Sequence, residues 1–315
     1  MYRYRRLLVA LSLTEQDEAA IRFTGLISRL AKSEKITFMH VTATLVNSLQ
    51  EVQSEFPDLK EASGETGKKI MQELVAKHWP ADHNASLGYE IIEGSPLIEL
   101  LRWAKKDDTD LIVMVKKQVP TESGSLPEKL IRRVPCSVLL VPENTKPDFN
   151  HVLVPTDFSE NSIAAMDAAV AFAAAKGIDQ IHCLHAYSVP LGYYKTGKSY
   201  EQFAEIMRGH AEKNYHNFLQ QEVCQAESVC QIRDLKGIEV TPIFKLEKNA
   251  AKAIAEEINT LNIDLLVIGA RGRHAGAGVL LGSVTEHQIK TTPIPILAVK
   301  KKGTGMNILD ALLQL

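Results

Sequence analysis

The sequence predicts an α/β protein made of two tandem, open, five-stranded parallel-sheet domains. Short apolar runs rich in β-branched residues alternate with helix-length amphipathic segments, which is the pattern of a parallel sheet covered by helices. This pattern occurs twice along the chain. The length of 315 residues also exceeds the size at which one hydrophobic core stops growing, so two domains are expected.

The two copies align strand by strand. The offset between matching strands drifts from 145 to 154 and then to 158 residues, because insertions and deletions separate the strands. The matching segments are Leu7–Thr14 with Val152–Ser159, Asp110–Val115 with Asp264–Gly269, and Pro135–Val141 with Pro293–Val299.

Each copy is expected to contain five strands with helices between them. In the first copy the strands are expected near residues 6–12, 35–42, 86–92, 110–115 and 136–141. In the second copy they are expected near 151–156, 180–187, 238–245, 264–269 and 294–300. A polar linker with two prolines, Pro142–Asn150, separates the copies. We therefore predict domains at 1–145 and 146–302 and a C-terminal tail at 303–315.

Charge and cysteine usage indicate a cytoplasmic protein without nucleic-acid or membrane partners. The 36 Lys and Arg residues nearly balance 38 Asp and Glu residues, so no overall field attracts polyanions. The four cysteines form no CxxC pair and are expected to be reduced thiols. The basic N-terminus precedes only a short apolar run that ends at acidic residues, which favours a buried strand over a signal peptide. No stretch approaches the roughly 18 apolar residues needed to span a bilayer.

A glycine-containing loop follows the fourth strand of the second copy. Gly269, Arg271 and Gly272 come directly after Ile268, and nine residues separate Gly272 from the pair Gly282 and Ser283. Glycines permit positive φ and close approach to a ligand. The amides of Gly282, Ser283 and Val284 would open a helix whose positive end favours phosphate, and Ser283 and Thr285 would add hydroxyl donors. The alternative is a plain strand-to-helix turn with Ser283 as its N-cap.

An acidic residue ends the first strand of the second copy, in the run Pro155-Thr156-Asp157. A carboxylate at the carboxyl edge of a strand can accept hydrogen bonds from ribose hydroxyls or a base amine. Asp157 can equally be an acid stabilised at a helix N-terminus. Taken alone it does not decide between these roles.

Together these segments resemble the universal stress protein domain. The resemblance rests on Val154–Ser159, on Leu184–Ala186, and on the glycine spacing from Gly269 to Ser283, which is similar to the nucleotide-binding signature of that family. It implies a Rossmann-like, adenine nucleotide α-hydrolase-like fold and an ATP site, with or without Mg²⁺. The resemblance places Asp157 and the backbone around Ala186 at the adenosine end, and Gly269, Arg271, Gly272, Gly282, Ser283 and Thr285 around ribose and phosphates. The predicted nucleotide-binding set also includes Pro155, Thr156, Ile268 and Val284.

The first copy departs from this signature. Ser12 replaces the acid, Leu11 replaces Thr156, and Val115 and Gln118 replace the first two glycines. Its loop is four residues shorter, although Gly124-Ser125 still suits a small anion. We therefore expect one nucleotide site per chain and a first domain that serves as a partner or small-ligand module.

A second phosphate-binding pattern, Gly192–Ser199, matches G-x4-G-K-[ST]. Four residues separate it from the preceding strand, which disfavours a P-loop enzyme. Lys195 or Lys198 of this loop could instead reach phosphates held by the glycine loop. The plain alternative is a solvated surface loop.

No catalytic or metal-ligating set is expected. His182 and His185 point to opposite faces of a strand, and Cys224 and Cys230 have unsuitable spacing. The predicted function is therefore ATP binding as a regulatory ligand, with slow or no hydrolysis and an unknown protein partner. The alternatives are an adenine-nucleotide-dependent hydrolase or ligase, and an interaction protein with a vestigial site.

The last strand of each copy would be an exposed edge unless it is paired. We predict that residues 137–141 pair with residues 296–299 in an intramolecular pseudo-dimer, as the resemblance implies, and that any homodimer uses another surface. The tail residues Met306–Leu315 suit a short amphipathic helix.

Overall fold

The computed structural model contains two compact units that divide between Asp148 and Phe149. It describes residues 4–42, 64–80, 84–117, 125–225, 238–272 and 281–300, without the side chains of 220–225. The sequence predicts a domain boundary after residue 145. That boundary, and independent folding of the segments on either side of it, stay predictions. Gln118, Gly124 and the C-terminal tail, all singled out from sequence, lie outside the described residues.

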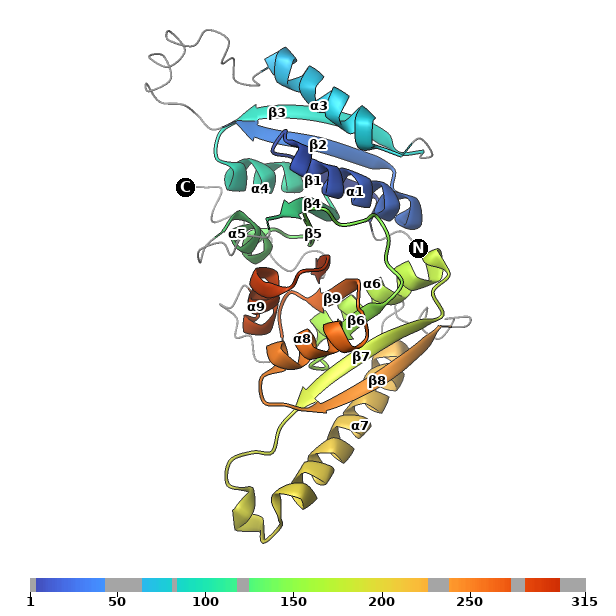
Figure 1. Ribbon diagram of the computed structural model, residues 1–315, viewed down its shortest axis with the longest axis vertical. Coiled ribbons are helices and arrows are strands. Elements are labelled where there is room, and N and C mark those ends of the chain that lie inside the picture. Colours follow the sequence, from blue (N-terminus) through green and yellow to red (C-terminus); the bar gives the residue numbers. More distant parts are fainter. Residues whose placement is uncertain are drawn as a thin grey trace. The chain divides into compact units, whose positions relative to one another are not determined.

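The first unit is an open sheet in the order β3-β2-β1-β4-β5, with every neighbouring pair parallel (Figure 1). Its strands are β1 (Arg6–Ala10), β2 (Lys35–Thr42), β3 (Ser86–Glu93), β4 (Leu111–Lys116) and β5 (Ser137–Pro142). Its helices are η1 (Glu15–Asp17), α1 (Glu18–Ala31), α3 (Gly64–His78), α4 (Pro96–Lys106) and α5 (Leu126–Arg133).

The second unit repeats this topology in the order β10-β9-β6-β7-β8, again with parallel neighbours. Its strands are β6 (Val152–Pro155), β7 (Gln180–Tyr187), β8 (Glu239–Leu246), β9 (Leu265–Gly269) and β10 (Ile296–Val299). Its helices are α6 (Glu160–Lys176), η2 (Tyr193–Thr196), α7 (Tyr200–Gln225), α8 (Ala250–Thr260) and α9 (Ser283–Thr291).

The predicted fold class and all ten predicted strands are confirmed, with bounds that differ by at most two residues. Both sheets carry helices on two faces. In the first unit α1 contacts α3, and α4 contacts α5; in the second unit α8 contacts α9. This grouping follows from right-handed crossovers, which place the helices after the first two strands on one face and the later helices on the other.

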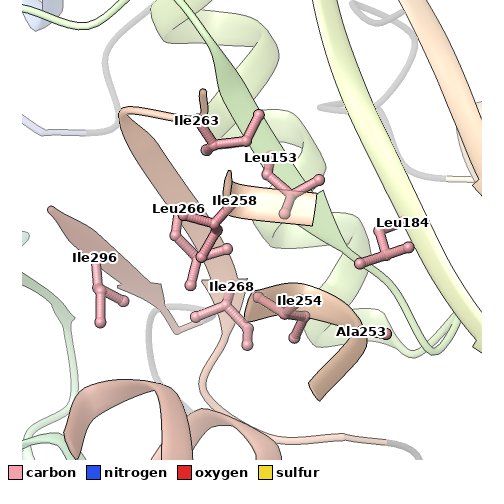
Figure 2. Packing of buried hydrophobic residues seen from close by; sticks show 9 residues of the cluster. All are labelled: Leu153, Leu184, Ala253, Ile254, Ile258, Ile263, Leu266, Ile268 and Ile296. Carbon is pink, nitrogen blue, oxygen red and sulfur yellow. The ribbon is translucent and has the colours of Figure 1, made fainter. Parts of the chain in front are cut away.

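The core beside the second sheet is aliphatic (Figure 2). Side chains from four strands meet one face of α8 and each is at most 5% exposed; they are Leu153, Leu184, Leu266, Ile268 and Ile296, with Ala253, Ile254, Ile258 and Ile263 from α8 and the segment after it. Burying each large aliphatic side chain contributes about 1.5–3 kcal/mol. This packing holds the carboxyl ends of β6, β7 and β9 next to the start of α8.

Within the described residues, no helix is both long enough and apolar enough to cross a membrane. The pairing predicted between residues 137–141 and 296–299 stays a prediction.

Candidate functional site

A cavity of about 480 Å³ opens at the carboxyl ends of β6, β7 and β9 in the second unit. The starts of α8 and α9 complete its wall. Strand β6 lies between β7 and β9. The chain leaves β6 through α6 and reaches β9 through α8, which lie on opposite faces of the sheet. A crevice is expected where the strand order reverses in this way.

All twelve residues that the sequence assigned to a nucleotide site line this cavity: Pro155, Thr156, Asp157, Ala186, Ile268, Gly269, Arg271, Gly272, Gly282, Ser283, Val284 and Thr285. The structure therefore brings together segments that are more than 100 residues apart in the chain. Their role in binding a ligand stays a prediction.

Asp157 is held in place by the start of α6. The Ser162 hydroxyl donates to Asp157 Oδ1 at 2.7 Å, and the Ser159 N–H donates to the same oxygen at 3.1 Å. Ser159 caps α6 by accepting from the Ser162 N–H. Asp157 therefore organises the helix start, as the second interpretation expects. It also lines the cavity, and its role as an acceptor for a ligand stays a prediction.

The three glycines of the loop have different structural roles. A Cβ on Gly269 would lie 2.9 Å from the backbone carbonyl of Asn161, so the end of β9 touches α6 without room for a side chain. A Cβ on Gly272 would lie 2.6 Å from Asp157 Oδ2. A Cβ on Gly282 would make only ordinary contacts, the nearest at 3.5 Å. The protein itself therefore leaves room for a Cβ at position 282.

Glycine permits positive φ, but the three glycines of this loop do not adopt it. None of the three is in the left-handed region, and Gly282 has φ of −72°. Close approach, rather than unusual backbone conformation, accounts for glycine at positions 269 and 272.

Helix α9 begins at Ser283 with Gly282 as its N-cap, so the alternative in which Ser283 caps the helix is wrong. The Gly282 N–H donates to the Ala270 carbonyl at 2.9 Å and is not available to a ligand. The first-turn amides of Ser283 and Val284 have no acceptor within the helix and suit an anion.

The two hydroxyls expected as donors differ. Thr285 Oγ1 is buried and donates to the Gly269 carbonyl at 2.8 Å, which fastens α9 to β9. The prediction that the Thr285 hydroxyl donates to a phosphate is therefore wrong, although Thr285 lines the cavity. Ser283 is exposed at the helix start and remains the candidate donor.

The sequence interpretation missed seven residues of the wall: Ser162, Leu184, His185, Ala250, Ile254, Leu281 and Glu286. His185 stacks on Phe158 with ring centroids 4.4 Å apart, and its Nδ1 lies 2.8 Å from the Thr156 carbonyl oxygen. Ala250 and Ile254 belong to the first turns of α8. Asn249, an N-cap residue type four positions after the end of the predicted strand 238–245, was the signal that this helix starts at the same edge.

The comparisons with known proteins agree with this architecture. The model of the universal stress protein family matches the chain twice, over residues 3–142 and 148–300. The chain belongs to the universal stress protein family. This confirms the resemblance stated from sequence.

Two curated relatives come from Methanocaldococcus jannaschii. Universal stress protein MJ0577 is 26% identical over 170 residues, which cover 50% of this chain and 98% of the relative. Universal stress protein MJ0531 is 26% identical over 155 residues, which cover 49% of this chain and 83% of the relative.

Solved structures that match both units include proteins from Archaeoglobus fulgidus and Pseudomonas aeruginosa. A universal stress protein from Archaeoglobus fulgidus gives a TM-score of 0.64 at 17% identity, covering 95% of this chain and 99% of that one. The functionally unknown protein PA1789 from Pseudomonas aeruginosa gives 0.63 at 16% identity, covering 99% and 97%. These likenesses show that the tandem fold is shared.

The first universal stress protein domain has a smaller cavity at the equivalent edge, of about 240 Å³. Here the Ser12 N–H donates to both carboxylate oxygens of Asp17, at 3.1 and 2.9 Å. Ser12 and Asp17 are five residues apart, as Asp157 and Ser162 are, but the serine and the acid have changed places. The carboxylate of the first domain is therefore on the helix side and almost completely buried.

The histidine near each cavity is shared by both domains. His40 Nδ1 lies 2.8 Å from the Leu11 carbonyl oxygen, in the same relation as His185 to Thr156. A contact present in both domains, with and without the glycine signature, indicates a structural role for this histidine.

The loop Gly192–Ser199 contains η2 and ends at Ser199, directly before α7. The Ser199 hydroxyl accepts from the Gln202 N–H at 3.2 Å, and Gln202 Oε1 accepts from the Ser199 N–H at 3.0 Å. Ser199 is thus a helix cap, which explains its place in the G-K-S pattern without a phosphate. Lys195 and Lys198 are exposed and do not line the described part of the cavity, so a phosphate contact by Lys198 stays a prediction.

Proposed function

We propose that this universal stress protein binds ATP in its second domain as a regulatory ligand and hydrolyses it slowly or not at all. The observation that carries the proposal is the cavity at β6, β7 and β9, which combines an apolar wall with a helix N-terminus. Its volume of about 480 Å³ falls in the roughly 300–1,000 Å³ range of small-molecule sites.

The cavity wall has chemistry suited to each part of a nucleotide. Leu184, Ala186 and Ile254 offer apolar surface for a base, and Asp157 offers an acceptor for hydroxyl or amine donors. The amides at the start of α9 and the guanidinium of Arg271 suit phosphates. Any Mg²⁺ would be bound mainly by phosphate oxygens and water, with Asp157 and Glu286 as the acidic side chains in the described wall.

Slow hydrolysis follows from how the side chains that could act as a general base are held in the described wall. Asp157 accepts from Ser162, Glu286 pairs with Lys290 at 3.1 Å, and His185 contacts the Thr156 carbonyl. A general base must reach the attacking water. Groups tied to the scaffold in this way are poorly placed to do so.

In this proposal the nucleotide reports cellular energy to a protein partner. A ligand that binds only the folded site stabilises it by mass action, so occupancy changes with nucleotide level. The first domain is the partner or small-ligand module, and the protein acts in the cytoplasm.

Calorimetric titration with ATP and native mass spectrometry test the site. Asp157→Ala is expected to weaken ATP binding about 10- to 100-fold, because a hydrogen bond to a charged group contributes about 1.5–3 kcal/mol. Gly282→Val is expected to abolish binding by filling the space in front of α9. Ser12→Ala, the matched change in the first domain, is expected to leave binding unchanged.

The same samples distinguish the alternatives. Absence of ATP binding by the unaltered protein supports an interaction protein with a vestigial site. Release of AMP and pyrophosphate in the presence of a substrate supports a ligase-type or hydrolase-type enzyme. Retention of full affinity by Asp157→Ala and Gly282→Val would show that the site is assigned wrongly.

A further inference from the structure

The first domain brings three potential metal ligands together on the face covered by α1 and α3. Glu15 and Glu18 lie at the start of this helical segment, and His78 is the last residue of α3. Their ligand atoms all lie within 4.8 Å of one another. His78 Nε2 is 3.5 Å from a Glu15 oxygen, and Nδ1 is 3.7 Å from a Glu18 oxygen.

His78 is deeply buried but lacks hydrogen bonds. Its side chain is 4% exposed, and neither ring nitrogen has a hydrogen-bond partner among the described residues. Buried polar groups in native proteins almost always have a partner, because an unsatisfied one costs free energy. Both nitrogens instead face carboxylates at distances too long for hydrogen bonds. A buried imidazole without a hydrogen bond, next to two carboxylates, is a candidate set of metal ligands.

Local structure sets the position of the two acids. Thr14 and Asp17 form a capping box at η1, which fixes the first turns of the helical segment. Residues 15 and 18 are three apart and therefore lie on one helix face. Helix α1 packs against α3, so this face meets His78.

Two cations partly neutralise the acids. Lys77 Nζ lies 2.9 and 3.0 Å from the two Glu15 oxygens, and an Arg22 nitrogen lies 3.0 Å from a Glu18 oxygen. The side chains of Glu15, Lys77 and Arg22 are each at least 46% exposed, so these pairs are weak and can rearrange.

We propose that Glu15, Glu18 and His78 bind one divalent transition-metal ion, and that Zn²⁺ is the ion this donor set favours. Glu15 lies nearer Nε2 and Glu18 nearer Nδ1, so one of the two carboxylates would turn toward the nitrogen that binds the ion. One imidazole nitrogen and two carboxylates would then leave a fourth position for water in a tetrahedral site. The ion would fasten α1 to α3. At the matching position of the second domain Ile163 replaces Glu18, so the site belongs to the first domain and not to the shared fold.

Calorimetric titration of the full chain with ZnCl₂, after treatment with a chelator, tests the proposal. One ion is expected to bind with a micromolar or lower Kd. His78→Gln is expected to weaken binding at least about 100-fold, and Glu15→Gln at least about 10-fold. His216→Gln, which changes an exposed histidine of α7, is the matched control and should bind Zn²⁺ like the unaltered protein.

Glu15→Gln keeps the test decisive if His78→Gln impairs folding, because the Glu15 side chain is 72% exposed. Co²⁺ gives a second readout. Its absorption should show d–d bands without a thiolate charge-transfer band, and His78→Gln should remove the d–d bands. A thiolate band would assign the ion to cysteine and overturn the proposal.

Lys77, whose ammonium group pairs with Glu15, provides an independent prediction. Lys77→Met removes a competitor and should lower the Kd for Zn²⁺, whereas Lys69→Met on the exposed face of α3 should not change it. An unchanged affinity in Lys77→Met would exclude Glu15 as a ligand. Absence of binding by the unaltered protein, or equal binding by His78→Gln, would overturn the proposal altogether.

Discussion

At the scale of single residues, the two domains differ by the exchange of a serine and an acid. In the second domain Asp157 follows the strand and Ser162 is on the helix; in the first, Ser12 follows the strand and Asp17 is on the helix. Burial raises the pKa of the Asp17 carboxyl, although N–H groups of Ser12 and Thr14 donate to it. In both domains a hydrogen bond joins the residue after the strand to the helix residue five positions later. In the first domain, however, the residue after the strand is not an acid.

Lys116, at the end of β4, leads to a prediction about pH. Burial lowers the pKa of Lys116 from 10.5 to about 8. Between these values the unfolded chain binds more protons than the folded chain, so folding stability increases as pH rises through this range. Lys116→Met removes the burial penalty on the charge and should stabilise the protein at pH 7 by at most about 3 kcal/mol.

Urea denaturation at several pH values measures this effect. The advantage of Lys116→Met should shrink as the pH rises from about 8 towards 10.5. Lys68→Met, on the exposed surface of α3, should show no such trend. A stabilisation by Lys116→Met that does not change with pH would contradict the explanation.

At the scale of elements, the contact between β9 and α6 requires Gly269. An alanine there would place its Cβ 2.9 Å from the carbonyl group of Asn161, and helix backbone cannot move aside cheaply. Gly269→Ala should therefore destabilise the second domain by about 1–3 kcal/mol. Chemical denaturation, followed by a probe in that domain, measures the change.

Two other glycines serve as controls for this prediction. Gly209 lies within α7 with nothing within 4 Å of an added Cβ, so Gly209→Ala should stabilise by roughly 0.5–1 kcal/mol. Gly282→Ala meets only ordinary contacts and should destabilise by no more than about 0.5–1 kcal/mol, because alanine is a poorer N-cap of α9 than glycine. If Gly269→Ala is as stable as Gly282→Ala, the close approach of β9 and α6 does not determine the choice of glycine.

At the scale of the whole molecule, the asymmetry between domains predicts one ATP per chain. At a concentration 100 times its Kd, ATP should stabilise the second domain by about 2.7 kcal/mol. Hydrogen exchange with and without ATP should show added protection in β6, β7, β9 and the starts of α8 and α9. The strands and helices of the first domain should exchange at unchanged rates. Two bound nucleotides per chain, or protection in the first domain, would contradict the prediction.

The sequence by itself determined the fold and most of the candidate site. Alternating apolar runs and amphipathic segments encode parallel strands and covering helices, because burial on both faces of the sheet demands that pattern. The repeat located ten strands. The motifs at strand ends, together with the family resemblance that they carry, located twelve wall residues; these meet because parallel strands bring their carboxyl ends to one edge.

Only the tertiary structure decided what each polar group contacts. Thr285 and Ser283 look equivalent as sequence, yet one hydroxyl is committed to the Gly269 carbonyl and the other is exposed. Glu15 and His78 are 63 positions apart, and no local periodicity predicts that α1 and α3 bring them within a few ångströms. Hydrogen bonds and ligand sets depend on distances of this size, and these distances are fixed by the packing of whole elements rather than by neighbours in the chain.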